Sequence, residues 1–186
     1  MKIIKRILVI VAVFIGILLL AAFVALFVKK DYAVEREIVI NKPKNEVFQY
    51  LKFVKNQDNF SKWNRMDPKM KKSYKGTDGQ VGFSYAWDSK DKHLGTGQQI
   101  ISKIKDGERI DMRLIFTKPM NAEDDCYFIT ESVDANTTKV KWGFTGAYPY
   151  PFNLMRLVFD MDKEVGGDFA TGLSNLKKVL ENNTTK

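Results

Sequence analysis

The chain has 186 residues, of which 45% are hydrophobic, and it carries a formal net charge of +8. Its single cysteine, Cys126, excludes an intrachain disulfide, and its single histidine, His93, excludes metal sites built from several histidines. The basic residues form no stripe interleaved with aromatic residues and match no nucleic-acid-binding motif, so nucleic acid is not an expected partner.

An apolar run near the N-terminus extends from Ile7 to Val28 without a charged residue. A short basic tail, residues 1–6, precedes the run, and two lysines follow it. At about 1.5 Å per helical residue the run is roughly 33 Å long, enough to cross a hydrocarbon core of about 30 Å. A cleavable signal peptide has a shorter apolar stretch that ends at a small-x-small site, and the alanines here do not fall at that spacing. We therefore interpret residues 7–28 as a permanent transmembrane anchor, which makes the membrane a partner.

The orientation of this span follows less directly from the sequence, because basic residues flank both of its ends. A tail as short as residues 1–6 normally stays in the cytoplasm, whereas large domains cross the membrane largely regardless of their charge. We expect a single-pass cell-membrane protein with its N-terminus in the cytoplasm and its domain on the non-cytoplasmic face.

Residues 32–182 are expected to form one water-soluble domain, which is long enough to bury a sizeable core. The alternating, β-branched segment 34–40 predicts a first strand. Apolar residues at helical spacing in 47–54 predict an amphipathic helix, and a second short helix is expected around 58–63. The densest basic stretch, residues 69–75, is interpreted as a solvated face.

The following part of the chain changes to a period of two, which predicts a meander of antiparallel strands with one apolar face and one wet face. The predicted strands are residues 81–87, 98–105, 110–116, 125–133 and 139–145.

The last segment returns to helical spacing, and its apolar stripe predicts a long helix that covers the sheet. The stripe is Val165, Phe169, Leu173, Leu176 and Leu180. Gly166, Gly167 and Gly172 inside this helix each cost about 1 kcal/mol relative to alanine. Close packing against the sheet, or room for a ligand, would explain them.

A set of short motifs then occurs in a recognisable order. The motifs are Trp63, Asp67-Pro68, Gly79-x-Val81-Gly82, Trp87, Gly95-x-Gly97 and Thr138-x-Val140-x-Trp142. Their order and spacing resemble the polyketide cyclase/dehydrase and lipid-transport group of the START-like (SRPBCC) superfamily, over nearly all of residues 32–180. The resemblance implies an α+β helix-grip fold: a strand, two short helices, a curved antiparallel sheet of about six strands and a long C-terminal helix. In this chain one transmembrane helix precedes that fold.

The resemblance also implies a deep cavity between the sheet and the last helix, since members bind lipids, sterols, polyketides and other hydrophobic molecules. The candidate ligand-binding residues lie on the apolar sheet face, on the helices or in the lead-in to the last helix. They are Trp63, Phe83, Tyr85, Trp87, Gln98, Met112, Leu114, Trp142, Phe144, Met155, Phe159 and Phe169. For each of them the alternative is a place in a filled core. Residues 148–151, with two tyrosines and two prolines, are either an entrance loop or a simple linker.

Candidate catalytic groups are sparse, and no catalytic residue, metal or cofactor is predicted. His93 is interpreted as an exposed loop residue and Cys126 as a small buried residue on its strand. Asp160 and Glu164 share a helix face but are interpreted as surface charge, and residues 123–125 as a solvated turn. The polar residues most suited to a hydrophobic pocket are Tyr85, Gln98 and Arg113, although Arg113 is expected on the wet face.

The favoured interpretation is a membrane-anchored module that binds a hydrophobic small molecule or lipid in the helix-grip cavity. One alternative is a cyclase/dehydrase-type enzyme on the same scaffold, which needs a titratable residue pointing into the cavity. Another is a protein-interaction or chaperone-like domain, which would expose an apolar patch instead. Ligand identity and oligomeric state stay open.

Overall fold

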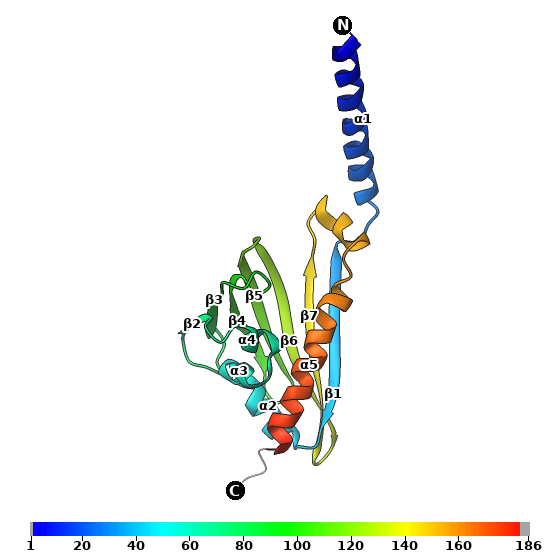
Figure 1. The fold of residues 1–186 in the computed structure, drawn as a ribbon. Helices are drawn as coiled ribbons and strands as arrows, with labels where there is room; N and C mark the ends of the chain where they lie inside the picture. The colour runs from blue at the N-terminus through cyan, green and yellow to red at the C-terminus, as the bar shows by residue number, and fades with distance from the viewer. Residues whose placement is uncertain (1, 183–186) are drawn as a thin grey trace. The chain divides into compact units, whose positions relative to one another are not determined.

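Residues 2–182 are described by a computed structural model of the chain (Figure 1). They divide into two compact units. The anchor unit comprises the residues up to Tyr32 together with Ala147–Asp160, and the grip unit comprises Ala33–Gly146 together with the residues from Met161 onward. The chain therefore leaves the grip unit once, at Ala147, and returns to it at Met161.

The anchor unit contains helix α1 (Lys2–Ala25) and the 3-10 helix η2 (Phe152–Leu157). Nearly every side chain of α1 is exposed, which is the environment of a helix that apolar lipid could surround. The helix is long and apolar enough to span a membrane, and a signal sequence near an N-terminus shares these properties. The apolar run continues to Val28, but the helix ends at Ala25 because Leu26 and Phe27 close a tighter turn.

The grip unit is built on seven strands in the spatial order β1-β7-β6-β5-β4-β3-β2, so that β2 to β7 form an antiparallel meander and β1 joins its end beside β7. The strands are β1 (Asp31–Ile40), β2 (Lys71–Lys75), β3 (Ser84–Asp88), β4 (Thr96–Lys105), β5 (Arg109–Lys118), β6 (Ala122–Asp134) and β7 (Thr137–Ala147).

Short helical segments fill the connection between β1 and β2, and one long helix ends the described chain. They are α2 (Lys44–Lys52), η1 (Val54–Asn56), α3 (Gln57–Phe60), α4 (Lys62–Met66) and α5 (Met161–Asn182). Asp78 fixes the start of η1 by accepting hydrogen bonds from the backbone N–H groups of Val54 and Lys55, at 2.8 and 3.2 Å. The side chain of Ser61 caps α4 by accepting from the backbone N–H of Asn64.

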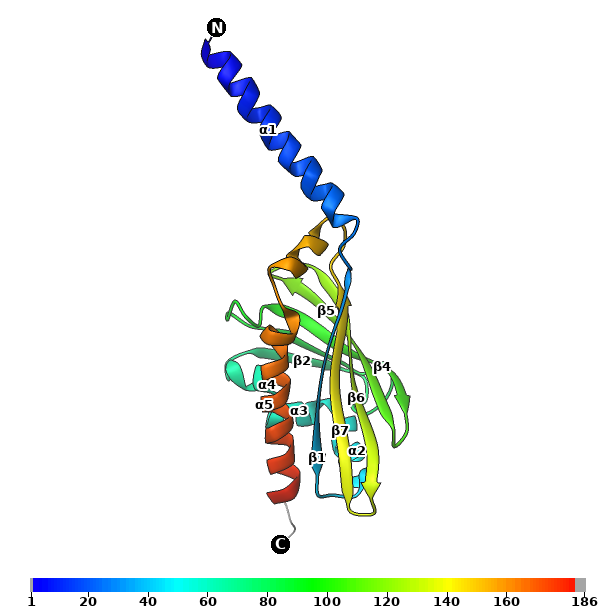
Figure 2. The same cartoon turned by 90° about the vertical axis from the view of Figure 1, so that its right-hand side faces the viewer.

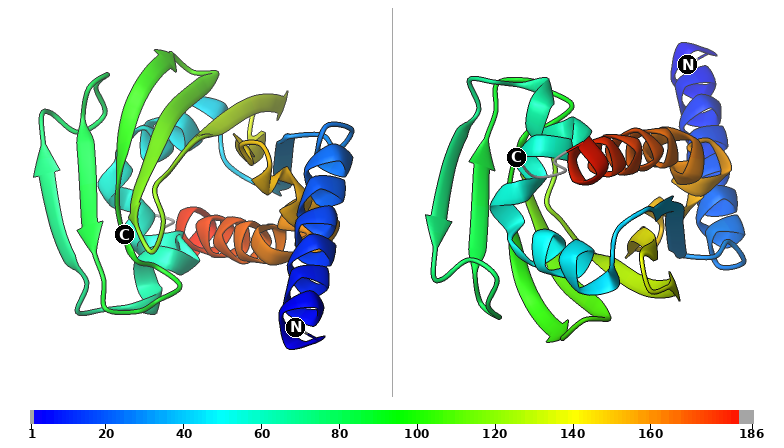
Figure 3. Two further views of the ribbon diagram at one scale, coloured as in Figure 1. Left: turned by 90° about the horizontal axis from the view of Figure 1, so that it is seen from above. Right: turned by 90° about the horizontal axis from the view of Figure 1, so that it is seen from below.

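Helix α5 lies along the concave side of the curved sheet (Figures 2 and 3). Its buried stripe includes Phe169, Leu173, Leu176 and Leu180, as the helical spacing predicted. The α+β helix-grip architecture predicted from the sequence, preceded by one apolar helix, is therefore confirmed.

The predicted strand 81–87 begins later than expected. Val81 lies outside it and is 60% exposed, and β3 starts only at Ser84. Gly79 and Gly82 adopt positive φ angles of 80° and 88°, so the backbone turns there instead of running extended. The basic stretch before it, interpreted as a solvated face, forms the edge strand β2, with four of its five residues exposed.

Candidate functional site

The concave face of the sheet is organised in rows of side chains that cross the strands, because antiparallel register places paired residues side by side on one face. Four such rows follow from the register. The Trp87 row is Trp87, Gly97 and Phe116; the Tyr85 row is Tyr85, Gln99, Leu114 and Asp124; the Phe83 row is Phe83, Ile101, Met112, Cys126 and Phe144; the Trp142 row is Ile110, Phe128 and Trp142.

The Trp142 row is a filled aromatic core. The ring of Trp142 stacks on Phe169 of α5 at 4.7 Å between centroids and lies 5.7 Å from Phe60 of α3. Trp63 of α4 adds edge contacts to Trp142 and Phe169, at 5.8 and 5.2 Å. Trp142 and Phe169 are buried, so their apolar surface is used in packing sheet against helices.

Gly172 of α5 makes this close packing possible. A Cβ atom at this position would lie 2.6 Å from Cζ3 of Trp142, which is closer than any real contact. The glycine therefore lets the backbone of α5 approach the indole ring. Close packing against the sheet, and not room for a ligand, therefore explains the glycine at position 172.

The Phe83 row is also buried, and two polar side chains from neighbouring parts of the fold approach it. Gln99 of the neighbouring row and Gln57 of α3 both direct their side-chain NH₂ groups at the sulfur of Met112. Both glutamines are at most 6% exposed. A sulfur is a weak acceptor, so these two amides retain hydrogen-bonding capacity inside the fold.

The Tyr85 row is the most polar part of the concave face. Tyr85 is 3% exposed, and among the described residues its hydroxyl group has no hydrogen-bond partner. Burial, with smaller contributions from Asp58 and Tyr74, raises the pKa of Tyr85 far above its usual range. The hydroxyl is therefore neutral at physiological pH and can donate a hydrogen bond. A buried hydroxyl without a partner costs about 1–3 kcal/mol, which an arriving acceptor would recover.

Asp124 completes the Tyr85 row from strand β6. It pairs in register with Leu114 and is 8% exposed, so a carboxyl group lies on the same face as the Tyr85 hydroxyl. The interpretation of residues 123–125 as a solvated turn is wrong: they belong to β6, and alternation along that strand turns Asp124 inward and its two neighbours outward.

The side chains of Trp87, Leu114 and Phe116 are partly exposed although they lie on the concave face. Trp87 is fixed in place, because its indole N–H donates to the carbonyl of Leu94 at 3.1 Å and its ring lies over Gly97. The ring of Phe116 meets it edge-on at 5.8 Å. This end of the face therefore presents ordered apolar surface that the helices leave accessible.

The predicted ligand-binding residues thus fall into separate groups. Trp63, Trp142 and Phe169 pack on one another, Phe83, Met112 and Phe144 form the buried row above them, and Tyr85, Trp87 and Leu114 lie at the accessible end.

The two remaining polar candidates lie on the other face of the sheet. Gln98 is partly exposed beside Ser84, and the glutamine that faces inward is its neighbour Gln99. Arg113 lies on the wet face, as expected, where it pairs with Glu123 at 3.2 Å. Residues Met155 and Phe159 lie in the anchor unit and are exposed.

Sequence reasoning missed Gln99 and Asp124 as members of this face, and it placed Phe116 on the face without naming it as a candidate binding residue. Phe116 carried a usable signal, because it continues the alternation of Met112 and Leu114. Gln99 and Asp124 carried none, since polar residues at alternating positions normally indicate the wet face.

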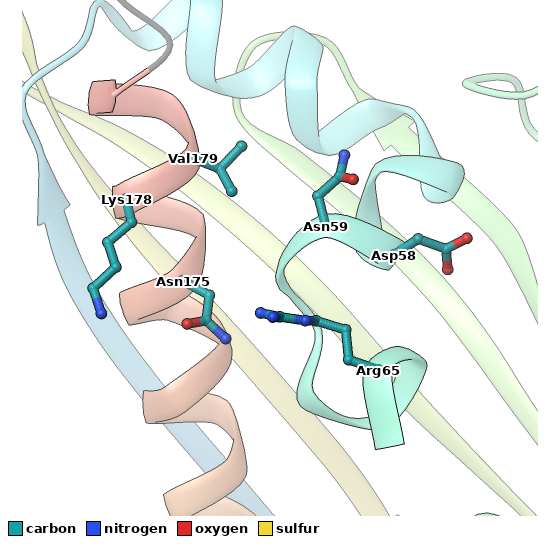
Figure 4. Close-up of a pocket in the computed structure, with 6 residues that line it drawn as sticks. All are labelled: Asp58, Asn59, Arg65, Asn175, Lys178 and Val179. Atoms are coloured by element: carbon teal, nitrogen blue, oxygen red, sulfur yellow. The ribbon is translucent and has the colours of Figure 1, made fainter. Parts of the chain in front are cut away.

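A hollow of about 700 Å³ lies between α5 and the α3–α4 segment (Figure 4). It is lined by Asp58, Asn59, Arg65, Asn175, Lys178 and Val179. The Asn175 side chain is held by its bond to the carbonyl of Phe60 at 3.2 Å, and Asp58 pairs with Lys72 at 2.7 Å. The lining is polar and open, so it offers no environment for an apolar ligand.

In the described part of the chain, the side chains that could act as a nucleophile, a general base or a metal ligand show no sign of such a role. Burial raises the pKa of the Cys126 thiol, so the thiol stays protonated. His93 is exposed, and Asp162 forms an ion pair with Arg36 at 2.8 Å. Within residues 2–182 no three His, Cys, Asp or Glu side chains are grouped to hold a metal ion.

Several solved structures are similar to this chain over most of its length. Norcoclaurine synthase from Thalictrum flavum, in complex with dopamine and hydroxybenzaldehyde, matches with a TM-score of 0.61 and 8% identity, covering 88% of this chain and 94% of that one. The Aha1 dimer from Colwellia psychrerythraea gives a TM-score of 0.56 and 14% identity, covering 83% and 99%. Ara h 8.0201 gives 0.52 and 15%, covering 82% and 99%. No protein-family model and no curated protein matches the sequence. At these identities the likeness establishes a shared helix-grip fold.

Proposed function

We propose that this protein is a membrane-anchored binding module for a hydrophobic small molecule or lipid, held at the accessible end of the concave sheet face. The proposal rests mainly on the buried Tyr85 hydroxyl, which has no hydrogen-bond partner among the described residues. It lies on the same sheet face as the partly exposed apolar side chains of Trp87, Leu114 and Phe116. An apolar surface with a few convergent polar groups is the usual composition of a small-molecule site. Norcoclaurine synthase, which shares the fold, was solved in complex with dopamine and hydroxybenzaldehyde, and this supports the binding of a small molecule by a fold of this kind.

The chemistry of the Tyr85 row narrows the ligand class. The Tyr85 hydroxyl offers a donor, and the Gln99 amide offers a second one on the neighbouring strand. An acceptor on an apolar body, such as a carbonyl or ether oxygen, fits these two donors. Each Å² of apolar surface that the ligand removes from water contributes about 25 cal/mol, before the cost of association.

The membrane part of the proposal rests on α1. Its length and apolar composition suit a span, and a ligand that dissolves in lipid would be concentrated at the surface to which the domain is tethered. The domain is proposed to face the non-cytoplasmic side.

The binding proposal is tested by native mass spectrometry of the full chain extracted from its own membrane in mild detergent. The wild-type protein is expected to carry a bound apolar molecule. Leu114→Trp fills the accessible end and should lose the bound molecule, whereas Ile115→Trp, one residue along on the opposite sheet face, should retain it. Equal loading of both variants, or no bound molecule in the wild type, contradicts the proposal.

Tyr85→Phe provides a sharper test, because it removes one oxygen atom and leaves the ring. The unliganded variant should be about 1 kcal/mol more stable than the wild type, since a buried hydroxyl without a partner is removed. Its occupancy by the ligand should nevertheless fall several-fold. Stability is measured by thermal unfolding of protein freed of its ligand, and occupancy by native mass spectrometry of protein extracted from its own membrane. Unchanged occupancy would exclude the hydroxyl from the site.

A second candidate is an enzyme of the cyclase or dehydrase type, favoured by one observation. Asp124 and Tyr85 place a carboxyl and a hydroxyl on one row of the concave face, and acid–base catalysis uses groups of these two kinds. Asp124→Asn separates the two functions. If the variant carries a molecule of different mass from the wild type, the wild-type protein converts it; identical bound molecules indicate binding without turnover.

A further inference from the structure

The anchor unit holds an exposed apolar segment against the end of helix α1. The contact is made by Asn153, which is fully buried at 0% exposure. Its side-chain NH₂ donates to the carbonyls of Ala25 and Val28, each at 2.7 Å. Carbonyls at a helix C-terminus have no partner within the helix, so Asn153 supplies one at the point where α1 ends.

Two further hydrogen bonds reinforce this clamp. The hydroxyl of Tyr150 donates to the carbonyl of Ala22 at 3.2 Å, one turn inside the helix. The guanidinium group of Arg156 donates to the carbonyl of Asp31. Residues 150–156 are therefore positioned relative to the last turn of α1 and the residues that follow it.

The outer side of the clamped segment is apolar and uncovered. Residues Phe152, Leu157 and Val158 are 65%, 67% and 78% exposed, and Phe159 is 47% exposed. Four large apolar side chains within eight residues form a patch of the kind that soluble surfaces avoid. Asn153 belongs to the same segment and donates to the carbonyls of Ala25 and Val28, so the segment that carries the patch is bonded to the end of α1.

We propose that residues 152–159 form a membrane collar, a segment that inserts its apolar side chains into the interfacial layer of the bilayer around the exit of α1. The proposal rests on the membrane-spanning role proposed for α1. The hydrogen bonds to Ala22, Ala25 and Val28 place the collar at the depth where the apolar run ends. At that depth the segment is surrounded by lipid, so lipid is the partner that we propose for its apolar side chains.

The polar residues around the collar suit the headgroup layer. Lys29 and Lys30 follow the apolar run directly, and each basic residue near an anionic lipid surface contributes about 1 kcal/mol. The rings of Tyr32 and Tyr148 meet at 5.2 Å in the same unit, and tyrosine is enriched at membrane interfaces. The sequence allowed residues 148–151 to be either an entrance loop or a simple linker. In this proposal they are part of the membrane contact.

The collar gives the grip unit two attachments to the membrane instead of one. The chain enters the grip unit after Tyr32, leaves it at Ala147 and returns at Met161 after passing through the collar. Two attachments restrict the rotation of a tethered domain more than a single linker does.

The test uses the full chain in nanodiscs of phosphatidylcholine with phosphatidylglycerol and a spin label at one introduced cysteine. Val158→Cys reports on the collar, Leu19→Cys on the span, and Val133→Cys, 56% exposed in the grip unit, on water. The native Cys126 is 5% exposed with a raised thiol pKa, so it does not compete for the label. Accessibility to oxygen and to a water-soluble nickel chelate is compared at the three positions.

The label at 158 is expected to show an oxygen-to-nickel accessibility ratio several-fold above that at 133 and below that at 19. If the label at position 19 is in lipid but the label at position 158 has the same accessibility ratio as the label at 133, the collar proposal is wrong and the membrane span is still supported. A label at 19 that is in water overturns the span as well. A label at 158 shielded from both reagents also overturns the collar, because it indicates protein contact with a second copy or with another part of the chain.

Asn153→Ala examines the clamp with the label kept at 158. Loss of the two hydrogen bonds should make the label more mobile and raise its accessibility to the nickel chelate. Unchanged accessibility would show that Asn153 does not position the collar. Asn136→Ala, on the turn between β6 and β7, is the matched control and should change neither quantity.

Discussion

At the scale of single residues, two glycines of one helix have different physical roles. Gly172 faces the sheet, where a Cβ atom would collide with the ring of Trp142. Gly167 has open space around its Cα, so nothing in the fold requires a glycine there. Substitutions at these two positions can therefore distinguish the effect of close packing on stability from the intrinsic cost of glycine in a helix.

Gly172→Ala is expected to lower the free energy of unfolding by about 1–3 kcal/mol, because the added methyl forces α5 away from Trp142. Gly167→Ala should raise it by up to about 1 kcal/mol through helix propensity alone. Chemical denaturation of the full chain in detergent, followed by tryptophan fluorescence, measures both. Equal effects of the two substitutions would contradict the packing role assigned to Gly172.

At the scale of elements, helix α5 is fastened to strand β1 by one ion pair at its first turn. The guanidinium of Arg36 donates to both carboxylate oxygens of Asp162 at 2.8 Å. The hydrogen bond from Arg36 holds the pKa of Asp162 below its ordinary value of 3.8. An acidic residue in the first turn also interacts favourably with the helix dipole.

The depressed pKa gives this ion pair a defined pH dependence. A carboxyl group whose pKa is lower in the folded state stabilises the fold above its unfolded pKa, and the contribution is lost as the pH falls through the folded pKa. The difference in Tm between wild type and Asp162→Asn should therefore be constant from pH 7 to about pH 5 and shrink below about pH 4. High salt should reduce it at pH 7, since both side chains are partly exposed.

Arg36→Met supplies the control for this pH series. In that background Asp162→Asn should have a smaller effect on Tm than in the wild type, because the ion pair with Arg36 is already absent. A pH-dependent difference of the original size in the Arg36→Met background would assign the effect of Asp162 to other groups.

At the scale of the whole molecule, the chain combines an apolar N-terminal helix with a helix-grip unit, and the two belong to separate compact units. The sidedness of the membrane decides which compartment the grip unit samples for its ligand. The proposed orientation places the grip unit outside the cytoplasm.

Val133→Cys tests this orientation. The introduced thiol lies at the exposed end of β6 in the grip unit. It should react in intact cells with a membrane-impermeant maleimide. The wild-type protein should stay unlabelled, because Cys126 is buried. Labelling of Val133→Cys only after the cells are permeabilised would place the grip unit in the cytoplasm. The mass of the labelled chain also shows whether α1 is retained or removed as a signal sequence.

The order of elements was predictable because it depends on local periodicity. The stripe at Phe169, Leu173, Leu176 and Leu180 has helical spacing, and the alternation at Met112 and Leu114 has strand spacing. The start of β3 was not predictable to the residue. Positive φ angles at Gly79 and Gly82 interrupt an alternation that the sequence continues through Val81.

The sequence by itself determined the apolar helix and the order of strands and helices, since both follow from the spacing of apolar residues along the chain, and the family resemblance implied the helix-grip fold. Only the tertiary structure decided which inward side chains are core and which remain accessible. That division depends on where α5 and the α3–α4 segment contact the sheet: they cover the Trp142 row completely and leave Trp87, Leu114 and Phe116 partly exposed. The burial of Gln99 and Asp124 and the clamp of Asn153 on Ala25 also join residues distant in the chain, and local periodicity carries no information about such contacts.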